Sequence, residues 1–299
     1  MRLAPICLFV YKRPELTKKT VEALKKNILA EESTLIIFSD AAKNEKDNSL
    51  VFEVRKYIKF IEGFKSVKII ERENNFGLSE SIISGVTEVI NQFDKVIVLE
   101  DDLITSKYFL KYMNEALDKY ENENKVMSIH GYIYPVKSKL PETFFLRGTD
   151  CWGWATWKNR WQTFEKDGKI LLDQLKEKKL AYSFDHNGTT NNIKMLKKQI
   201  AGKVDSWAIR WHASAFLQNK LTLYPAKSLV NNIGMGGDST HLGKTSIYVT
   251  TLSQAPVKLD DIPVKENKFA GKEMEKFYSS IKPNFIKRYY KKIKYLLGF

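Results

Sequence analysis

The stretch that most constrains this chain is residues 95–102, where an apolar, β-branched run ends in Glu100, Asp101 and Asp102. Consecutive apolar residues predict a strand buried on both faces, as in a parallel sheet. Three adjacent carboxylates repel one another, so a folded protein tolerates them best where a cation lies between them. Their oxygens favour a hard divalent ion, Mg²⁺ or Mn²⁺. A solvated acidic turn before the next helix is the alternative that this stretch alone leaves open.

The chain of 299 residues is long enough for one large α/β domain or for one domain with an appended lobe. Its two cysteines, Cys7 and Cys151, provide neither a disulfide framework nor metal-ligand spacing, so we expect a reducing compartment, the cytoplasm. No apolar run reaches the length of a transmembrane helix. The apolar segment 3–10 runs into charged residues without a small-residue cleavage site, so we interpret it as a first strand.

Up to Asp102 the hydrophobic pattern alternates between strands and helices, which predicts a parallel sheet with helices packed on it. We expect strands at 5–10, 35–38, 67–70 and 95–99, separated by amphipathic helices at 14–28, 50–61 and 78–92. A further helix follows, with Ser106 as its predicted N-cap. Arg13, Asp40 and the acidic triplet each follow a predicted strand. Ligands of open α/β sheets bind at that edge, so this position favours a binding site over a solvated turn.

The second half of the chain has a different pattern. Strands are expected at 126–129 and 144–146, but the regular alternation stops there. All six tryptophans lie between residues 152 and 211. We expect both halves to share one continuous sheet, with any boundary between them near residues 135–145.

These features, in this order, resemble glycosyltransferases of the GT-A fold, both the bacterial family 2-like enzymes and the N-acetylglucosaminyltransferase I group. The similarity extends over most of residues 4–245. The motifs that carry it are residues 9–14 (FVYKRP), 38–40 (FSD), 99–103 (LEDDL), 151–154 (CWGW), 205–207 (DSW) and 234–241 (GMGGDSTH). The resemblance implies an α/β fold of the Rossmann-like GT-A type, with a mostly parallel central sheet and helices on both faces.

The resemblance also implies a division of the chain into three parts. Residues 1–140 would be the nucleotide-sugar-binding α/β half, and residues 141–265 the acceptor-binding and catalytic half of the same domain. Residues 266–299 would form a basic, amphipathic C-terminal helix.

In such enzymes a divalent ion stabilises the negative charge that develops on the departing diphosphate. The resemblance implies that Asp102 ligates this ion, Mn²⁺ or Mg²⁺, and that Glu100 and Asp101 bind hydroxyls of the donor's sugar and ribose. Asp40 resembles the residue that reads a uracil ring, and Arg13 one that contacts the nucleotide diphosphate. The alternative for Arg13 is a solvated cation at the start of a helix.

Inverting transfer also needs a base that accepts the proton of the attacking hydroxyl. Asp205 is the predicted base, because residues 205–207 resemble the Asp-containing, Trp-flanked motif of the N-acetylglucosaminyltransferase I group. A helix N-terminus there would keep its carboxylate ionised. A simple N-cap is the alternative for Asp205, and Asp150 is the second candidate for the base.

The tryptophan cluster suits a wall against a sugar ring, although most tryptophans belong to protein cores. We expect Trp152 or Trp154 to line the donor site, with Gly153 permitting close approach. Residues 234–243 contain four glycines and His241. This segment is expected to close over the donor, with His241 near the diphosphate or the metal.

The chain departs from the family pattern at Gly85, about where the N-acetylglucosaminyltransferase I group has a histidine for the nucleotide. In that group the histidine contacts the nucleotide, so the family pattern does not fix which residues of this chain contact the base and ribose. We therefore favour a UDP-linked sugar as the donor, but the sequence does not identify the nucleotide.

The formal net charge is +14, and residues 276–299 supply half of it with seven Lys or Arg and no acid. A short helix after Pro283, in which cationic and aromatic residues are mixed, suits the surface of an anionic membrane. We expect peripheral association with the inner face of the cell membrane. A helix packed on the enzyme, with a solvated basic face, is the alternative.

Together these features predict an inverting, metal-dependent glycosyltransferase that moves a hexosyl or N-acetylhexosaminyl group. The acceptor would be a glycan or a lipid-linked precursor of a cell-surface polysaccharide. A nucleotidyltransferase is the closest enzymatic alternative, but residues 11–14 occupy the place of its Gly-rich phosphate loop. A non-catalytic protein that binds a glycan or a nucleic acid is the other alternative. No nucleic-acid module is recognisable, so no nucleic acid is expected as a partner.

Overall fold

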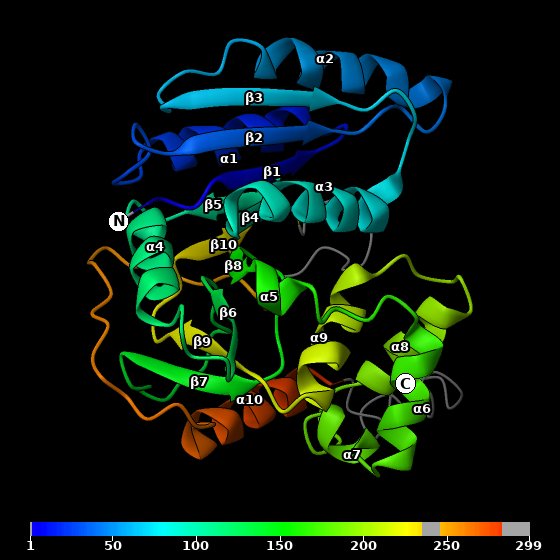
Figure 1. Ribbon diagram of the computed structural model, residues 1–299, viewed down its shortest axis with the longest axis vertical. Coiled ribbons are helices and arrows are strands. Elements are labelled where there is room, and N and C mark those ends of the chain that lie inside the picture. Colours follow the sequence, from blue (N-terminus) through cyan, green and yellow to red (C-terminus); the bar gives the residue numbers. More distant parts are fainter. Residues whose placement is uncertain (1, 235–245, 283–299) are drawn as a thin grey trace, which may run out of the picture.

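The computed structural model describes residues 2–234 and 246–282. Its elements are β1 (Ile6–Val10), α1 (Pro14–Lys25), β2 (Thr34–Ser39), the 3₁₀ turn η1 (Glu45–Asp47), α2 (Asn48–Ile58), β3 (Ser66–Glu71), α3 (Gly77–Phe93), β4 (Lys95–Glu100), β5 (Leu103–Thr105), α4 (Phe109–Lys119), β6 (Val126–His130), β7 (Thr143–Arg147), β8 (Trp154–Trp157), α5 (Lys158–Trp161), α6 (Gly168–Glu177), α7 (Ala181–Phe184), α8 (Asn192–Ile200), α9 (Trp207–Leu217), β9 (Leu221–Pro225), β10 (Val230–Asn232) and α10 (Lys268–Ile281). Among these residues, eight strands form one sheet in the order β3-β2-β1-β4-β8-β6-β9-β7, and β10 pairs with β5. Helices cover both faces of the sheet (Figure 1). The predicted α/β architecture is confirmed.

The first four strands of the sheet are parallel and the rest are mixed. β1 pairs in parallel with both β2 and β4, and β2 pairs in parallel with β3. β8 is antiparallel to β4 and β6, β9 is parallel to β6, and β7 is antiparallel to β9. Because parallel strands end at the same edge of a sheet, the turns after β1, β2 and β4 share one edge.

Alternate residues of the parallel strands enter two different cores. Ile6 and Leu8 of β1 pack in the core that includes residues of α1, α2 and α4. Cys7 and Phe9, which point the other way, pack with residues of α3 and α9. Both faces of β1, β2 and β4 are buried, which explains their apolar runs, whereas the edge strand β3 is partly exposed.

Helix α3 approaches the sheet closely at Gly85. The rings of Phe9 and Phe38 are stacked with centroids 5.0 Å apart. A Cβ atom at Gly85 would lie 2.7 Å from the ring of Phe9. The two rings thus fill the space that a side chain at residue 85 would need, which accounts for the departure from the family pattern.

Five of the six tryptophans belong to the core. Trp154, Trp157, Trp161, Trp207 and Trp211 are each less than 5% exposed. Trp152 is only partly buried and packs at the margin of a core. Of the two tryptophans predicted to line the site, the one that faces solvent is therefore Trp152.

Residues 158–217 add a group of helices beside the second half of the sheet, seen at the lower right of Figure 1. Leu171, Leu196 and Phe216 share a small core of their own, which joins α6, α8 and α9. Helix α10 packs below the sheet, where Ala270 and Met274 contact residues of β7 and β9.

The chain after the acidic triplet differs from the prediction. Residues 103–105 form β5, which pairs with β10, and helix α4 begins at Phe109 after the N-cap Tyr108. The hydroxyl of Ser106 donates instead to the carbonyl of Ser253 at 2.7 Å. The prediction of Ser106 as the N-cap is wrong, because this segment pairs with residues far along the chain before it turns into the helix.

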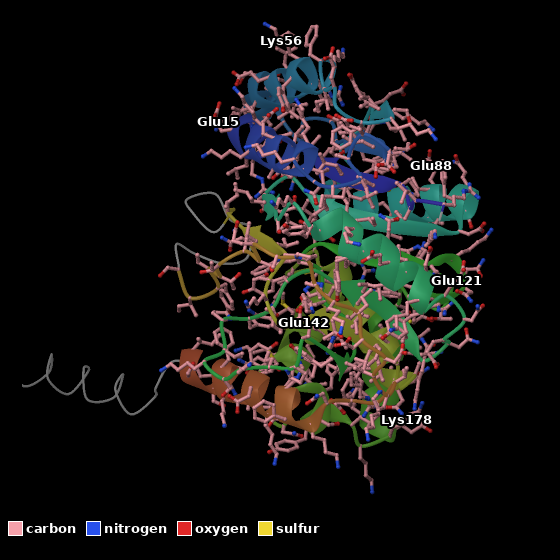
Figure 2. The ribbon with its side chains drawn as sticks, turned by 90° about the vertical axis from the view of Figure 1, so that its left-hand side faces the viewer. Glu15, Lys56, Glu88, Glu121, Glu142 and Lys178 are labelled. Carbon is pink, nitrogen blue, oxygen red and sulfur yellow. The ribbon has the colours of Figure 1, made fainter. Side chains whose placement is uncertain are left out.

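Charged side chains such as Glu15, Lys56 and Lys178 project from the outside of the molecule (Figure 2). Within residues 2–234 and 246–282, no helix combines the length and the apolar character that crossing a membrane requires. His241 and the helix predicted after Pro283 lie outside the described residues. Their predicted roles stay predictions, as does the three-part division of the chain.

Candidate active site

The end of β4 meets the segment after β1. Phe9 and Glu100 are direct neighbours in the β1–β4 register. Arg13, directly before α1, reaches across to the two following carboxylates. Its Nη1 donates to Oδ2 of Asp102 at 2.8 Å, and its Nη2 pairs with Oδ1 of Asp101. The structure thus brings Arg13 to two predicted site residues that lie 88 and 89 positions further along the chain.

Burial dominates the electrostatics of this cluster. It raises the pKa of Glu100 to about 8, with the neighbouring charge of Asp102 acting in the same direction. Burial also raises the pKa of Asp101 to about 6, although the charge of Arg13 opposes this shift. For Arg13, burial alone would lower the pKa, but Asp101 and Asp102 outweigh it and raise the pKa above its usual value. Asp101 and Asp102 therefore share one guanidinium, and burial still raises the pKa values of Glu100 and Asp101.

The cluster leaves oxygen ligands available for a hard cation. Oδ2 of Asp101 is buried without a hydrogen-bond partner. Within residues 2–234 and 246–282, however, no group of three or more His, Cys, Asp or Glu residues could hold a metal by itself. A divalent ion held by one or two carboxylates needs further oxygens, and in phosphoryl and glycosyl donors the phosphates provide them. The residues present fit a metal that binds together with a diphosphate.

Gly234 lies directly against Asp102. The amide of Ile233 donates to the carbonyl of Asp102 at 2.8 Å. A Cβ atom at Gly234 would lie 2.1 Å from Oδ2 of Asp102. Gly234 is the first residue of the segment that is predicted to close over the donor. No pattern in the sequence connects this glycine with Asp102.

Asp40 holds the turn that begins α3. Its Oδ1 accepts hydrogen bonds from the amides of Ala41 and Phe76, both at 2.9 Å. Its Oδ2 accepts from the amide of Gly77 at 2.9 Å and from the side chain of Asn75 at 3.2 Å. The described contacts thus give Asp40 a structural function, and its contact with a uracil ring stays a prediction.

A cleft of about 490 Å³ lies beside the end of β4. It is lined by carboxylates and aromatic rings that come from widely separated segments: Glu100, Tyr134, Asp150, Trp152, Asp205, Trp207, Tyr248 and Tyr278. Aromatic faces stack on sugar rings and carboxylates accept hydrogen bonds from hydroxyls, so the lining suits a saccharide. Tyr134, Tyr248 and Tyr278 were missed, because no local pattern connects them.

Asp205 lines the cleft between two helix N-termini. The N-cap of α9 is Ser206, whose hydroxyl accepts from the amide of Ile209. Asp205 itself is exposed, and its Oδ2 accepts from the amide of Ser79, near the start of α3, at 3.3 Å. Asp205 is thus not the N-cap, and it lines the cleft. Its role as the base stays a prediction.

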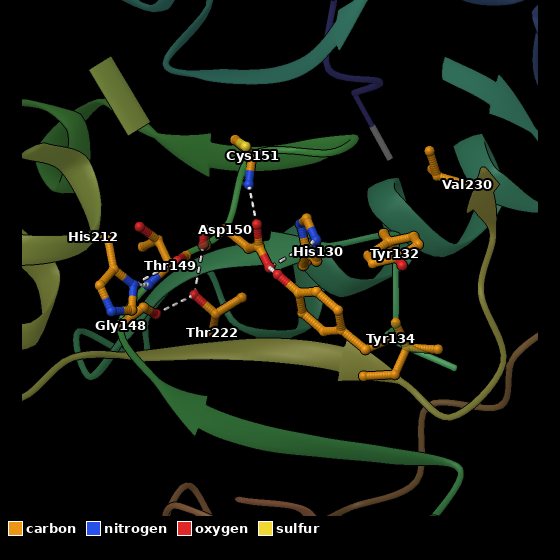
Figure 3. Close-up of polar contacts among 12 residues, drawn as sticks. His130, Tyr132, Tyr134, Gly148, Thr149, Asp150, Cys151, His212, Thr222 and Val230 are labelled. Atoms are coloured by element: carbon orange, nitrogen blue, oxygen red, sulfur yellow. Dashed lines mark hydrogen bonds and ion pairs between the residues drawn. The ribbon is translucent and has the colours of Figure 1, made fainter. Parts of the chain in front are cut away.

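Asp150 also lines the cleft, and its carboxylate is held by hydrogen bonds (Figure 3). Its Oδ1 accepts from the amide of Cys151 and its Oδ2 from the hydroxyl of Tyr134, both at 2.9 Å. Nε2 of His130 lies 3.8 Å from the same oxygen. Burial lowers the pKa of His130 to about 4, so this imidazole is neutral at pH 7 and forms no ion pair with Asp150.

The remaining predicted residues lie nearby. Trp152 lines the cleft, with its ring packed edge-on against Tyr132 at 4.7 Å between centroids. Gly153 has a φ of +67°, and a Cβ atom there would lie 2.6 Å from Val230. The described contacts explain this glycine by chain packing, so donor contact by Gly153 stays a prediction.

The sequence matches the model of the family "Glycosyl transferase family 2" over residues 6–188. No curated protein matches it.

Three solved structures have limited similarity to this chain. A mannosyltransferase from Pyrobaculum calidifontis, in complex with GDP-Man and Mn²⁺, has 9% identity and a TM-score of 0.33, over 45% of this chain and 36% of that one. Residues 1–349 of S. aureus TarS have 11% identity and a TM-score of 0.41, over 77% of this chain and 61% of that one. The same TarS segment in complex with UDP has 14% identity and a TM-score of 0.31, over 46% and 38%.

The chain thus spans less than two thirds of each of these structures, and TM-scores below 0.5 carry no conclusion about its substrates. The family match does support a conclusion, because it extends over more than half of the sequence. It includes β1 to β4, the acidic triplet, Asp150 and Trp152. On that ground, the chain belongs to glycosyl transferase family 2.

Proposed function

We propose that this protein transfers a sugar from a nucleotide-sugar to a hydroxyl of an acceptor bound in the cleft. The observation that carries the proposal is that the cleft with Asp150 and Asp205 lies beside the Arg13–Asp101–Asp102 cluster at the sheet edge. A donor diphosphate at the cluster would direct its sugar toward Glu100, which lines the cleft.

The donor side would be formed by residues of the sheet edge. Asp102 would ligate Mn²⁺ or Mg²⁺ together with the diphosphate, and Arg13 would pair with a phosphate oxygen. When bound, the ion supplies positive charge against the departing diphosphate. Asp101 and Glu100 would bind hydroxyls of the donor, and a protonated Glu100 can donate as well as accept.

The acceptor side would perform the proton transfer. In the proposed inverting reaction, an acceptor oxygen forms a bond to the anomeric carbon as the bond between that carbon and the phosphate oxygen breaks. Asp205 takes the hydroxyl proton, and the nucleoside diphosphate leaves. Asp150 is the second candidate for this base, and Trp152 would stack on a sugar ring.

The donor we favour is a UDP-sugar, and the acceptor class is a glycan or a lipid-linked saccharide of a cell-surface polysaccharide. The support for a lipid-linked acceptor is the basic segment after residue 282, because Lys282 itself lines the cleft. Peripheral binding of that segment to an anionic membrane would bring a lipid-linked acceptor to the cleft.

A thermal-shift panel of UDP-, GDP-, CMP- and dTDP-sugars, with and without Mn²⁺, tests the donor proposal. A donor at a hundredfold excess over its dissociation constant should stabilise the fold by about 2.7 kcal/mol. Asp102→Ala should abolish the metal-dependent part of this stabilisation. A wild-type protein that responds to none of these sugars would exclude the proposed function.

A further inference from the structure

Arg13 forms ion pairs with the carboxylates of both Asp101 and Asp102. The side chains of Asp101 and Asp102 are 3% and 11% exposed, and that of Arg13 is 25% exposed. Each terminal nitrogen of the guanidinium pairs with a different carboxylate. A forked, charge-assisted arrangement of this kind is stronger than a single ion pair.

The guanidinium pairs with one of the two oxygens through which Asp102 could ligate a metal. Oδ2 of Asp102 accepts from Nη1 of Arg13 at 2.8 Å, and a Cβ atom at Gly234 would lie 2.1 Å from the same oxygen. A divalent cation at this carboxylate would lie close to a second positive charge, which repels it. Arginine does not lose its proton in proteins, so the conflict is relieved only if the side chain moves.

The backbone of Arg13 is anchored while its side chain can turn. The carbonyl of Arg13 accepts from the amide and the hydroxyl of Thr17, at 2.9 and 2.8 Å. The carbonyl of Asp101 accepts from the hydroxyl of Thr20 at 2.9 Å, which joins the acidic turn to α1. An exchange of partners by Arg13 therefore needs rotation of one partly exposed side chain and no movement of the main chain.

We propose that Arg13 blocks the metal-binding carboxylates of the free protein and releases them when it turns to the donor diphosphate. This inference rests on the proposed donor site and adds a coupling to it: the divalent ion and the nucleotide bind well only together. By thermodynamic linkage, each strengthens the binding of the other by the same factor.

The test measures Mn²⁺ binding by the electron paramagnetic resonance signal of the free ion, with and without UDP, in the full chain. For wild type we expect weak binding of Mn²⁺ alone and at least roughly tenfold tighter binding with UDP. R13Q should bind Mn²⁺ alone roughly tenfold more tightly than wild type and lose most of the coupling. The result for Mn²⁺ alone does not depend on which nucleotide the donor carries.

The matched control is K12Q. Lys12 is the adjacent cation, but it pairs with Asp47 at 2.7 Å and not with the acidic triplet. Its removal should leave Mn²⁺ binding as in wild type. R13K keeps a positive charge without the fork and should be intermediate, and circular dichroism checks that each variant is folded.

A second substitution, Asp102→Asn in the R13Q background, should remove the gain in Mn²⁺ affinity. A gain that survives this change, or an R13Q and an R13K that both bind Mn²⁺ no more tightly than wild type, would overturn the inference. Sugar transfer by wild type together with either result would leave the proposed function intact. Absence of any nucleotide-sugar binding by wild type would instead reject the proposed function.

Discussion

The two ends of the candidate site hold their carboxylates in different ways. At the end of β4, Asp101 and Asp102 are nearly buried and both pair with the guanidinium of Arg13. In the cleft, Asp150 and Asp205 accept from neutral donors, the hydroxyl of Tyr134 and backbone amides, and they border an open space of about 490 Å³.

The difference has a consequence for each end. In the proposed function, charge pairing at the β4 end rearranges when a metal and a diphosphate bind, because Arg13 pairs with one oxygen of each carboxylate. The cleft needs no such exchange, because hydrogen bonds from neutral groups hold Asp150 without neutralising it. We therefore expect the β4 end to govern donor binding and the cleft to govern transfer.

The largest expected effect separates the two cleft carboxylates. Asp205→Asn keeps the size of the side chain but removes the proton acceptor, so kcat for transfer should fall by roughly 10²- to 10⁴-fold while donor binding is retained. Asp150→Asn is the matched control and should lower kcat by less than about tenfold. Single-turnover transfer and donor thermal shifts measure the two quantities. The reverse order of effects would identify Asp150 as the base.

The next expected effect separates the two tryptophans near the site. Trp154 is 1% exposed and packs against Trp207, with ring centroids 5.2 Å apart. Trp154→Ala should therefore lower the free energy of unfolding by about 3–5 kcal/mol. Trp152→Ala should destabilise less and instead raise KM for the acceptor, since this ring lines the cleft. Equal destabilisation by both, measured by urea unfolding, would make Trp152 a core residue.

A smaller effect concerns His130, which lies near Asp150, and the loss of folding stability at acidic pH. The pKa of His130 is about 4 in the fold, below its usual value of about 6.5, because burial disfavours the charged imidazole, although Asp150 opposes this. The unfolded chain thus binds more protons than the folded chain between pH 4 and 6.5. The contribution of His130 to the free energy of unfolding is therefore fully present above pH 6.5 and is lost as the pH falls to 4. The loss amounts to about 3 kcal/mol for this group alone.

Urea unfolding at several pH values measures this loss. His130→Gln should make stability less dependent on pH in that window, because the group that titrates is gone. The groups facing His130 are Asp150, Tyr132 and Tyr224, whose side chains the substitution leaves in place. An unchanged pH dependence in the variant would show that His130 is not the source of acid sensitivity.

The smallest expected effect concerns the packing of the parallel half. Gly85→Ala places a Cβ atom against the ring of Phe9 and should destabilise the fold by about 1–3 kcal/mol. Gly271→Ala in α10 is the control, because the nearest atom to its Cβ would be 3.9 Å away. This change should be neutral or stabilise by up to about 1 kcal/mol. Equal unfolding midpoints for the two variants would contradict the close packing of α3.

The sequence by itself determined the parallel half of the sheet and the chemistry at its edge. Apolar runs buried on both faces and helices between them predict β1 to β4, and a parallel sheet brings the ends of its strands to one edge. For that reason Arg13, Asp40 and Asp102 could be assigned to one region without coordinates. The local rule failed at Ser106, where pairing of β5 with the distant β10 replaced the expected helix start.

Only the tertiary structure decided how these groups are used. It showed that Arg13 pairs with Asp101 and Asp102, that Asp40 holds the start of α3, and that Trp152 and not Trp154 lines the cleft. It also brought Tyr134, Tyr248 and Tyr278 around Asp150 and Asp205. The physical reason is the range of the interactions: periodicity reflects neighbours within a few residues, whereas the contacts of the site join segments that lie 16 to 89 residues apart.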